Sequence, residues 1–244
     1  MNQAAGETEA ARYLQEGSGP WADLALTLPI FLLYHLLVVF LDVRNAADLV
    51  TRELVTLAHN SLPAYGGLTL AIGATFAGIL IMAGRERELH YQRFLWVALE
   101  GIAYAVAMRF AASYVVGKLH LAAGPMDVTL GDRFAGLVMS LGAGFYEEIA
   151  FRVLLFGAGL KVLFLLFTAL TPVKRVLLSI GWALVAAAVF SGWHYVGELG
   201  DPFDPRSFVF RWVCGLAFTA IYAFRGFAPA VWTHTLYDVW VLVF

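Results

Sequence analysis

Three short clusters of polar residues lie inside otherwise hydrophobic stretches of this 244-residue sequence. They are Glu147-Glu148-Ile149-Ala150-Phe151-Arg152, Phe190-Ser191-Gly192-Trp193-His194 and His234-Thr235-Leu236-Tyr237-Asp238. An ionisable side chain inside a membrane-spanning helix costs about 2.5–3.5 kcal/mol on insertion scales, and it normally faces a protein interior or an aqueous cavity. We therefore interpret these clusters as candidate functional residues.

The spacing inside each cluster brings side chains together. Residues four positions apart lie on one face of an α-helix, so Glu148 and Arg152 can form an ion pair, and His234 and Asp238 can face one cavity. Glu147 points about 100° away from Glu148 around an α-helix, so Arg152 neutralises it less readily. Glu147 is therefore available as a base.

These residue types are typical of hydrolysis by an activated water. A carboxylate in a low-dielectric site can take a proton from water, and a histidine can donate a hydrogen bond to a developing oxyanion. No covalent nucleophile is required. The sequence contains neither the H-E-x-x-H motif of zinc proteases nor the G-x-S-x-G motif of serine hydrolases.

The elements that must position these residues are membrane helices. Hydrophobic residues make up 61% of the chain and charged residues 14%, whereas a soluble domain carries roughly 25% charged residues. Because a spanning helix needs about 20 mostly apolar residues, we predict helices at about 22–41, 66–84, 94–117, 134–156, 159–171, 175–196, 207–224 and 228–243. The predicted fold class is all-α, a polytopic bundle of seven or eight transmembrane helices around a polar cavity.

Two regions leave the path of the chain open. Gly157 and Gly159 interrupt a hydrophobic run, which is read as a broken helix, a half-span or a separate full span. Residues 42–65 have an amphipathic pattern, which favours an interfacial helix. We expect Pro63 and the Gly66-Gly67 pair to end this helix.

Basic residues predict the orientation. Arg85, Arg87 and Arg93 form the clearest basic loop, which is expected to be cytoplasmic together with the N-terminus. Lys174 and Arg175 fit the same side only if the fourth and fifth predicted helices together cross the bilayer an odd number of times.

The three motifs, in order, resemble the type II CAAX prenyl endopeptidase family, which includes bacterial Abi and bacteriocin-processing relatives. The resemblance rests on the motifs E-E-x-x-x-R, F-x-x-x-H and H-x-x-x-(N/D). It covers roughly residues 134–244. Any one motif is a weak signal, but the ordered trio is a strong one. The resemblance implies an intramembrane endopeptidase.

The resemblance also implies a role for each motif residue. Glu147 is the general base that activates the attacking water, and His194 completes the water site. His234 and Asp238 correspond to the pair that polarises the scissile carbonyl and stabilises its oxyanion. The supporting residues are Glu148 and Arg152, as an ion pair, and Phe190, as a packing or substrate-lining residue.

Asp238 departs from the family pattern, because the best-known members carry asparagine there. An ionised aspartate only accepts hydrogen bonds, so Asp238 must be protonated, orient His234 or bind a metal. Glu147, His194, His234 and Asp238 together offer a ligand set that suits zinc. The sequence leaves open whether a divalent metal is present.

We read the chain as one membrane domain in three parts. These are a polar N-terminal tail at 1–20, N-terminal membrane helices at 21–133 and a CAAX-protease-like catalytic core at 134–244. A net charge of −2 with dispersed basic residues argues against a nucleic-acid partner. The predicted location is a membrane crossed several times, the inner membrane if the source is bacterial.

The predicted function is hydrolysis of a peptide bond in a membrane-associated peptide or lipidated protein, with membrane lipid as the other partner. Whether the substrate is prenylated stays open. Two alternatives also stay open: a proton-coupled transporter, which also places ionisable residues in spans, and an inactive scaffold or immunity protein. Four further polar residues of the predicted spans match no motif and are interpreted as packing or interfacial groups: Asp23, His35, Glu100 and Arg109.

Overall fold

The structure is a computed structural model that describes residues 13, 19–41, 45–48, 50–59, 61–83, 91–119, 133–197 and 200–244. Within these ranges the chain is helical and contains no strand, which confirms the predicted all-α class. Arg85, Arg87 and most of the predicted polar tail lie outside the described residues.

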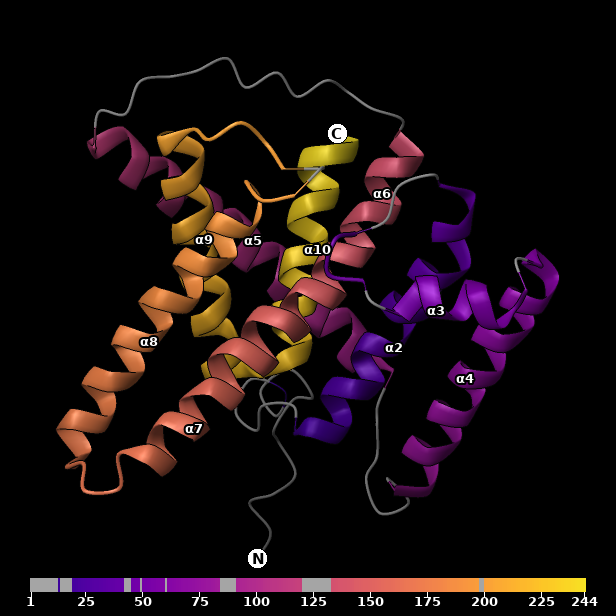
Figure 1. Cartoon of the computed structure of the whole chain (residues 1–244), viewed down its shortest axis with the longest axis horizontal. Helices are drawn as coiled ribbons and strands as arrows, with labels where there is room; N and C mark the ends of the chain where they lie inside the picture. The colour runs from indigo at the N-terminus through magenta and orange to yellow at the C-terminus, as the bar shows by residue number, and fades with distance from the viewer. Residues whose placement is uncertain are drawn as a thin grey trace, which may run out of the picture.

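Seven long helical segments and one short helix build the described part of the fold (Figure 1). In chain order they are α2 (Pro20–Leu37) with the short 3-10 turn η1 (Val38–Phe40), α3 (Val50–Leu57), α4 (Leu62–Ala83), α5 (Gln92–Lys118), the rod made of α6 (Arg133–Gly142), η2 (Ala143–Ala158) and α7 (Gly159–Leu166), then α8 (Pro172–Trp193), α9 (Pro205–Arg225) and α10 (Phe227–Val243).

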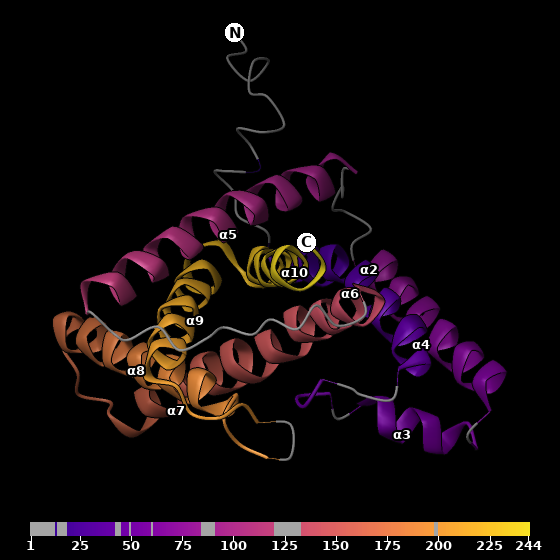
Figure 2. The ribbon, with the colours of Figure 1, turned by 90° about the horizontal axis from the view of Figure 1, so that it is seen from above.

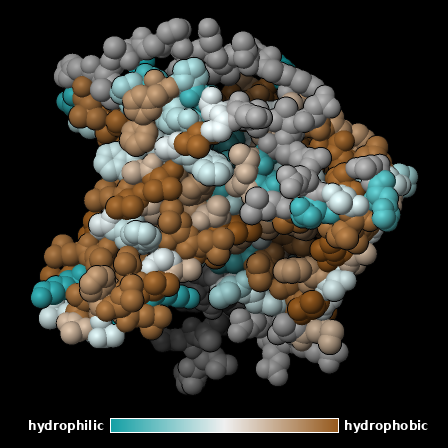
Figure 3. Space-filling model, in the orientation of Figure 1, coloured by the Kyte–Doolittle hydropathy of each residue, from teal (hydrophilic) through white to brown (hydrophobic). Residues whose placement is uncertain are grey.

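Six of these segments are long and apolar enough to cross a membrane, and α10 is slightly shorter at 17 residues. Only 17–39% of each apolar window is buried inside the protein, so most of the apolar side chains point outward. Figure 3 shows hydrophobic residues over much of the face that it presents. Lipid hydrocarbon suits such a surface and water does not. The protein is therefore a multi-pass membrane protein.

The region around Gly157 is one continuous helical rod from Arg133 to Leu166. Of the three readings left open for this region, the separate full span is excluded, because α7 continues the rod. The long segments number seven among the described residues, within the predicted seven or eight. The glycines serve close packing instead of breaking the helix: a Cβ on Gly157 would lie 3.0 Å from the Tyr222 hydroxyl.

Because this rod crosses the bilayer once, the two predicted basic loops can lie on the same side of the membrane. The end of α7 and the start of α8 lie in the lower part of Figure 1, as do the end of α4 and the start of α5. Lys174 and Arg175 therefore share one side with Arg93, as the orientation predicted from the basic residues requires. The connection between α8 and α9 and the C-terminus lie at the opposite end (Figure 1).

The short helix α3 lies within the segment predicted to be interfacial. Asp48 begins it, because its Oδ1 accepts hydrogen bonds from the backbone N–H groups of Val50 at 3.0 Å and Thr51 at 2.9 Å, as N-cap residues do. Pro63 and the Gly66-Gly67 pair do not end a helix here; they lie in the first turns of α4. Proline is well tolerated in a first turn, so that prediction is wrong.

The last helix, α10, lies in the middle of the bundle, in contact with α2, α5, α6, η2 and α9 (Figure 2). Asp23 on α2 fixes its start, accepting hydrogen bonds from the backbone N–H groups of Phe227 at 2.9 Å and Ala228 at 3.2 Å. Gly226 has φ +105°, and a Cβ on it would lie 2.7 Å from Asp23 Oδ2. Asp23, which matches no motif, is thus the cap of the helix that carries the third motif.

Candidate active site

The first motif lies on a widened helix. η2 is a π-helix, in which backbone hydrogen bonds run from i to i+5, so the expectation of an ordinary α-helix here is wrong. Hydrophobic spacing does not distinguish the two forms. π-helical turns occur frequently at functional sites. This one buries the side chains of Glu147, Glu148 and Arg152.

Glu148 connects the first motif to the third. Its Oε1 lies 3.1 Å from Arg152 Nη1, so the predicted ion pair is present. The same oxygen accepts a hydrogen bond from His234 Nδ1 at 2.7 Å. On the other side of the imidazole ring, His234 Nε2 lies 3.5 Å from Asp238 Oδ2. His234 therefore sits between two carboxylates.

Gly144 allows η2 and α10 to come this close. A Cβ on Gly144 would lie 1.9 Å from Thr235 Oγ1 and 2.8 Å from the Thr235 backbone nitrogen. Even an alanine would force the two helices apart. The hydrogen bond between Glu148 and His234 therefore depends on a glycine one turn earlier on η2.

Two phenylalanines enclose the buried Arg152 guanidinium. Its central carbon lies 4.2 Å from the ring centroid of Phe190 and 4.9 Å from that of Phe218, which is a cation–π arrangement. Phe218 also stacks on His234, with ring centroids 4.4 Å apart. Phe190 packs against Arg152, which is the first of the two roles predicted for it. Phe218 was missed by sequence reasoning, because its spacing on α9 indicates only a buried helix face.

His194 caps the C-terminal end of α8, where its Nδ1 donates a hydrogen bond to the Phe190 carbonyl at 3.0 Å. Burial lowers the pKa of His194, and the nearby Glu147 charge opposes this effect in part. The imidazole is therefore neutral near pH 7. Glu147 and His194 are close enough to interact electrostatically, but they form no hydrogen bond with each other.

Glu147 is buried, with 7% of its surface exposed. Its Oε1 accepts a hydrogen bond from the Asn45 side-chain amide at 2.8 Å, while its Oε2 is buried without a hydrogen-bond partner. A buried carboxylate oxygen is costly when it has no partner, so Oε2 keeps an unused capacity to accept a hydrogen bond. Asn45 was missed because it lies 102 residues earlier in the chain.

A second polar cluster surrounds Tyr146, the residue directly before Glu147. The Tyr146 hydroxyl lies 2.5 Å from His35 Nε2, and His35 Nδ1 lies 3.0 Å from the Tyr65 hydroxyl. Close by, the Tyr34 hydroxyl donates to Asp48 at 2.7 Å. These contacts tie η2 to α2, α4 and the start of α3. His35 therefore serves packing, as interpreted, through specific hydrogen bonds.

The four residues considered as possible zinc ligands do not form a metal site in the described part of the chain. The set was Glu147, His194, His234 and Asp238. Among the described residues, no group of three or more His, Cys, Asp or Glu side chains could hold a metal ion. His234 directs Nδ1 to Glu148, and one oxygen of Glu147 is bound by Asn45. The arrangement does not fit a metal, and no catalytic step is derived through one.

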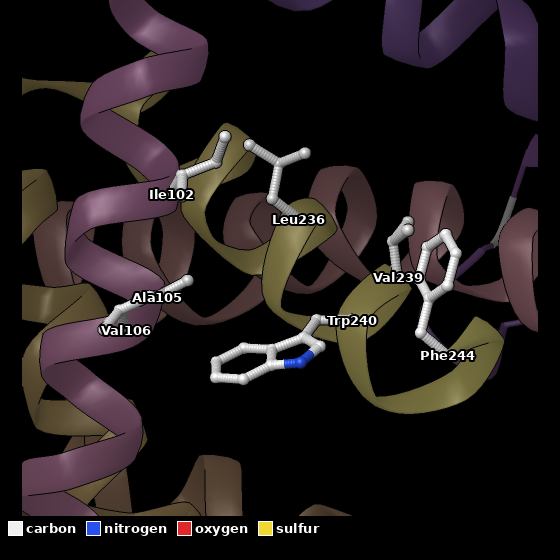
Figure 4. A pocket seen from close by; sticks show the side chains of 7 residues that line it. All are labelled: Ile102, Ala105, Val106, Leu236, Val239, Trp240 and Phe244. Carbon is white, nitrogen blue, oxygen red and sulfur yellow. The ribbon is translucent and has the colours of Figure 1, made fainter.

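An apolar pocket lies between α5 and α10, and its close-up is Figure 4. Its volume is about 290 Å³, and its lining residues are Ile102, Ala105, Val106, Leu236, Val239, Trp240 and Phe244. No ionisable side chain lines it. The pocket fits a hydrocarbon chain better than a polar group, and it is chemically distinct from the buried carboxylates.

The family comparison covers the part of the chain that carries all three motifs. Residues 128–240 match a family model described as type II CAAX prenyl endopeptidase, Rce1-like. These residues belong to the type II CAAX prenyl endopeptidase family. The Rce1-like match confirms the coarser part of the predicted function, a membrane protease. No curated protein and no solved structure matches the chain.

Within this Rce1-like domain, η2, α8 and α10 bring the three motifs together. Glu148, Arg152 and His234 are in direct contact. Glu147 and His194 lie beside them without touching each other. Asn45 and α2 to α5 lie outside the matched residues, although Asn45 makes the hydrogen bond to Glu147.

Proposed function

We propose that this protein is an intramembrane endopeptidase that hydrolyses a peptide bond by means of a water activated by Glu147. The observation that carries the proposal is the state of the Glu147 carboxylate, which is buried with one oxygen fixed and the other without a partner. A general base needs an oxygen that is free to accept a proton and is held in a defined position.

The reaction begins when Glu147 Oε2 takes a proton from water, as the water oxygen bonds to the carbonyl carbon of the substrate. The neutral His194 helps to hold that water. Negative charge then develops on the carbonyl oxygen, which needs a hydrogen-bond donor. His234 Nε2 is that donor once it carries a proton, and the carboxylates of Glu148 and Asp238 stabilise the resulting positive ring.

In the second step the carbon–nitrogen bond breaks. The proton held by Glu147 passes to the leaving nitrogen and the second water proton stays on the new carboxyl group, so the products are one peptide with a new carboxylic acid and one with a new amine. Asp238 acts through His234 in this scheme, because an ionised carboxylate cannot donate to the oxyanion. This role accommodates the aspartate at the position where the best-known family members carry asparagine.

The substrate in this proposal is a membrane-associated peptide or a lipidated protein. A prenylated CAAX-type tail is the first to test, because the family description names that class. The apolar pocket between α5 and α10 supports a substrate or lipid that carries a hydrocarbon chain.

Cleavage of a fluorogenic peptide library by the purified protein tests the proposal. The library contains matched peptides with and without a prenyl group, and products are identified by mass spectrometry. Wild type is expected to cut, and Glu147→Ala and His194→Ala are expected to lose activity. A chelator arm reports separately on metal dependence; this mechanism predicts no loss with chelator.

Glu100→Gln is the matched control. Glu100 is a partly buried carboxylate that pairs with Arg225 at 2.6 Å, and this ion pair involves none of the three motifs. The Glu100→Gln variant should therefore keep the wild-type cleavage activity. Equal cleavage by all the variants would overturn the assignment of the site. No cleavage of any peptide by the wild type would favour the scaffold or transporter alternative.

A further inference from the structure

The hydrogen bond to the candidate base comes from the N-terminal half of the chain. Asn45 lies in the short connection between η1 and α3, far outside the matched residues 128–240. We propose that Asn45 is a positioning residue that orients the Glu147 carboxylate, so that the N-terminal half completes the active site. This inference rests on the proposed function.

The orientation of the Asn45 amide is fixed by its own turn. Its Oδ1 accepts a hydrogen bond from the Ala47 backbone N–H at 2.9 Å, which is an Asx turn. The amide nitrogen must then face the other way, where it donates to Glu147 Oε1 at 2.8 Å. With only 7% of Asn45 exposed, water does not compete well for either bond.

The connection that carries Asn45 is anchored at its other end. Asp48 caps α3 with Oδ1, and its Oδ2 accepts hydrogen bonds from the hydroxyls of Tyr34 and Thr51. Tyr34 is fully buried on α2, and its ring packs edge-on against Tyr146, the neighbour of Glu147. The amide and the carboxylate are therefore held by one continuous set of buried contacts.

This arrangement has a catalytic consequence. Fixing Oε1 leaves Oε2 as the proton-accepting atom and prevents the carboxylate from rotating out of line with the water. A misplacement of about 1 Å in a catalytic group can cost about 100-fold in rate. Loss of the amide should therefore reduce kcat, while substrate binding and KM change little.

Asn45→Asp separates the positioning role from a structural one. Aspartate has the same shape and still accepts from the Ala47 N–H, so a residue needed only for the turn would tolerate the change. It cannot donate to Glu147, and it places a second carboxylate beside the first. We expect kcat to fall by at least about 10-fold, within the range seen when catalytic groups are misplaced, with KM nearly unchanged.

The double variant Asn45→Asp with Glu147→Gln gives a readout that needs no substrate. It exchanges the amide and the carboxylate, so a hydrogen bond forms again with the donor on residue 147. The melting temperature, lowered in Asn45→Asp, should recover in the double variant, while activity stays absent. Recovery is expected only if the two side chains are in direct contact.

The outcomes separate this inference from the proposed function. If Glu147→Gln is inactive but Asn45→Asp keeps the wild-type kcat, the positioning role is overturned and the proposed function stands. If Glu147→Gln keeps its activity, the proposed function itself fails. If Asn45→Asp does not fold and the double variant does not restore folding, the contact is absent and the inference is overturned.

Discussion

Glu148 and His234 lie 86 residues apart in the chain and are joined by a hydrogen bond of 2.7 Å. The same Glu148 oxygen faces Arg152 at 3.1 Å. The second glutamate of the first motif is therefore the point where η2, α10 and the buried arginine meet. Glu148 holds His234 in place through this contact, whereas the proposed function assigns the activation of water to its neighbour Glu147.

Glu148→Gln should destabilise the protein strongly. It removes the negative charge that compensates the buried Arg152, and breaking one side of a buried ion pair costs about 3–5 kcal/mol. Thermal unfolding of the purified variant measures this loss. Asp201→Asn is the control, because Asp201 pairs with Arg211 at the surface, where such pairs contribute about 0–1 kcal/mol. Equal shifts for both variants would contradict the account.

Phe218→Leu should lower activity as well as stability. The change keeps an apolar side chain but removes the ring that stacks on His234 and faces Arg152, a cation–π contact that contributes about 0.5–2 kcal/mol. We expect a fall of several-fold in kcat/KM, measured on the best library substrate. Phe224→Leu on the same helix, where Phe224 is 85% exposed, should match wild type; a similar fall there would refute a specific role for Phe218.

The membrane class and the three motifs were predictable, because ionisable residues stand out inside apolar helices and their spacing is local. Phe218 was not, since one phenylalanine on a buried helix face looks like any other core residue. Asn45 was not, because it lies 102 positions before Glu147 and its distance from that residue depends on how the chain between them folds. The π-helix and the unbroken rod through Gly157 also follow from packing partners, which hydropathy does not report.

Gly226→Ala should destabilise the start of α10. Its φ of +105° disfavours any residue with a Cβ, and the added carbon would meet Asp23; a strained backbone of this kind costs about 1–3 kcal/mol. Gly181→Ala is the contrasting control, because Gly181 is helical with open space around it, and alanine there should raise stability by up to about 1 kcal/mol. Melting temperatures that shift in the same direction would contradict the capping role.

His194 should contribute to loss of stability in acid. Burial lowers its pKa in the folded protein, whereas in the unfolded chain it takes up a proton near the ordinary value of about 6.5. The unfolded state then binds more protons, so the contribution of His194 is complete above about pH 6.5 and is lost as the pH falls further.

The His194→Asn variant tests this pH dependence. Asparagine keeps a donor for the Phe190 carbonyl but does not titrate in this range. The decrease in melting temperature between about pH 8 and about pH 5 should be smaller in this variant than in wild type. His59→Gln, at an exposed position, is the control and should show the wild-type decrease. An unchanged decrease in His194→Asn would show that the imidazole is not held neutral by burial.

The kcat/KM of Glu147→Gln, measured beside wild type and Glu100→Gln in lipid nanodiscs, tests the central claim most directly. Glutamine keeps the size of the side chain but cannot accept the proton from water, so a loss of at least about 100-fold is expected. Glu100→Gln should stay close to wild type, because its carboxylate lies in a separate ion pair with Arg225. Activity of Glu147→Gln close to that of wild type, or equal losses in both variants, would contradict a mechanism based on Glu147.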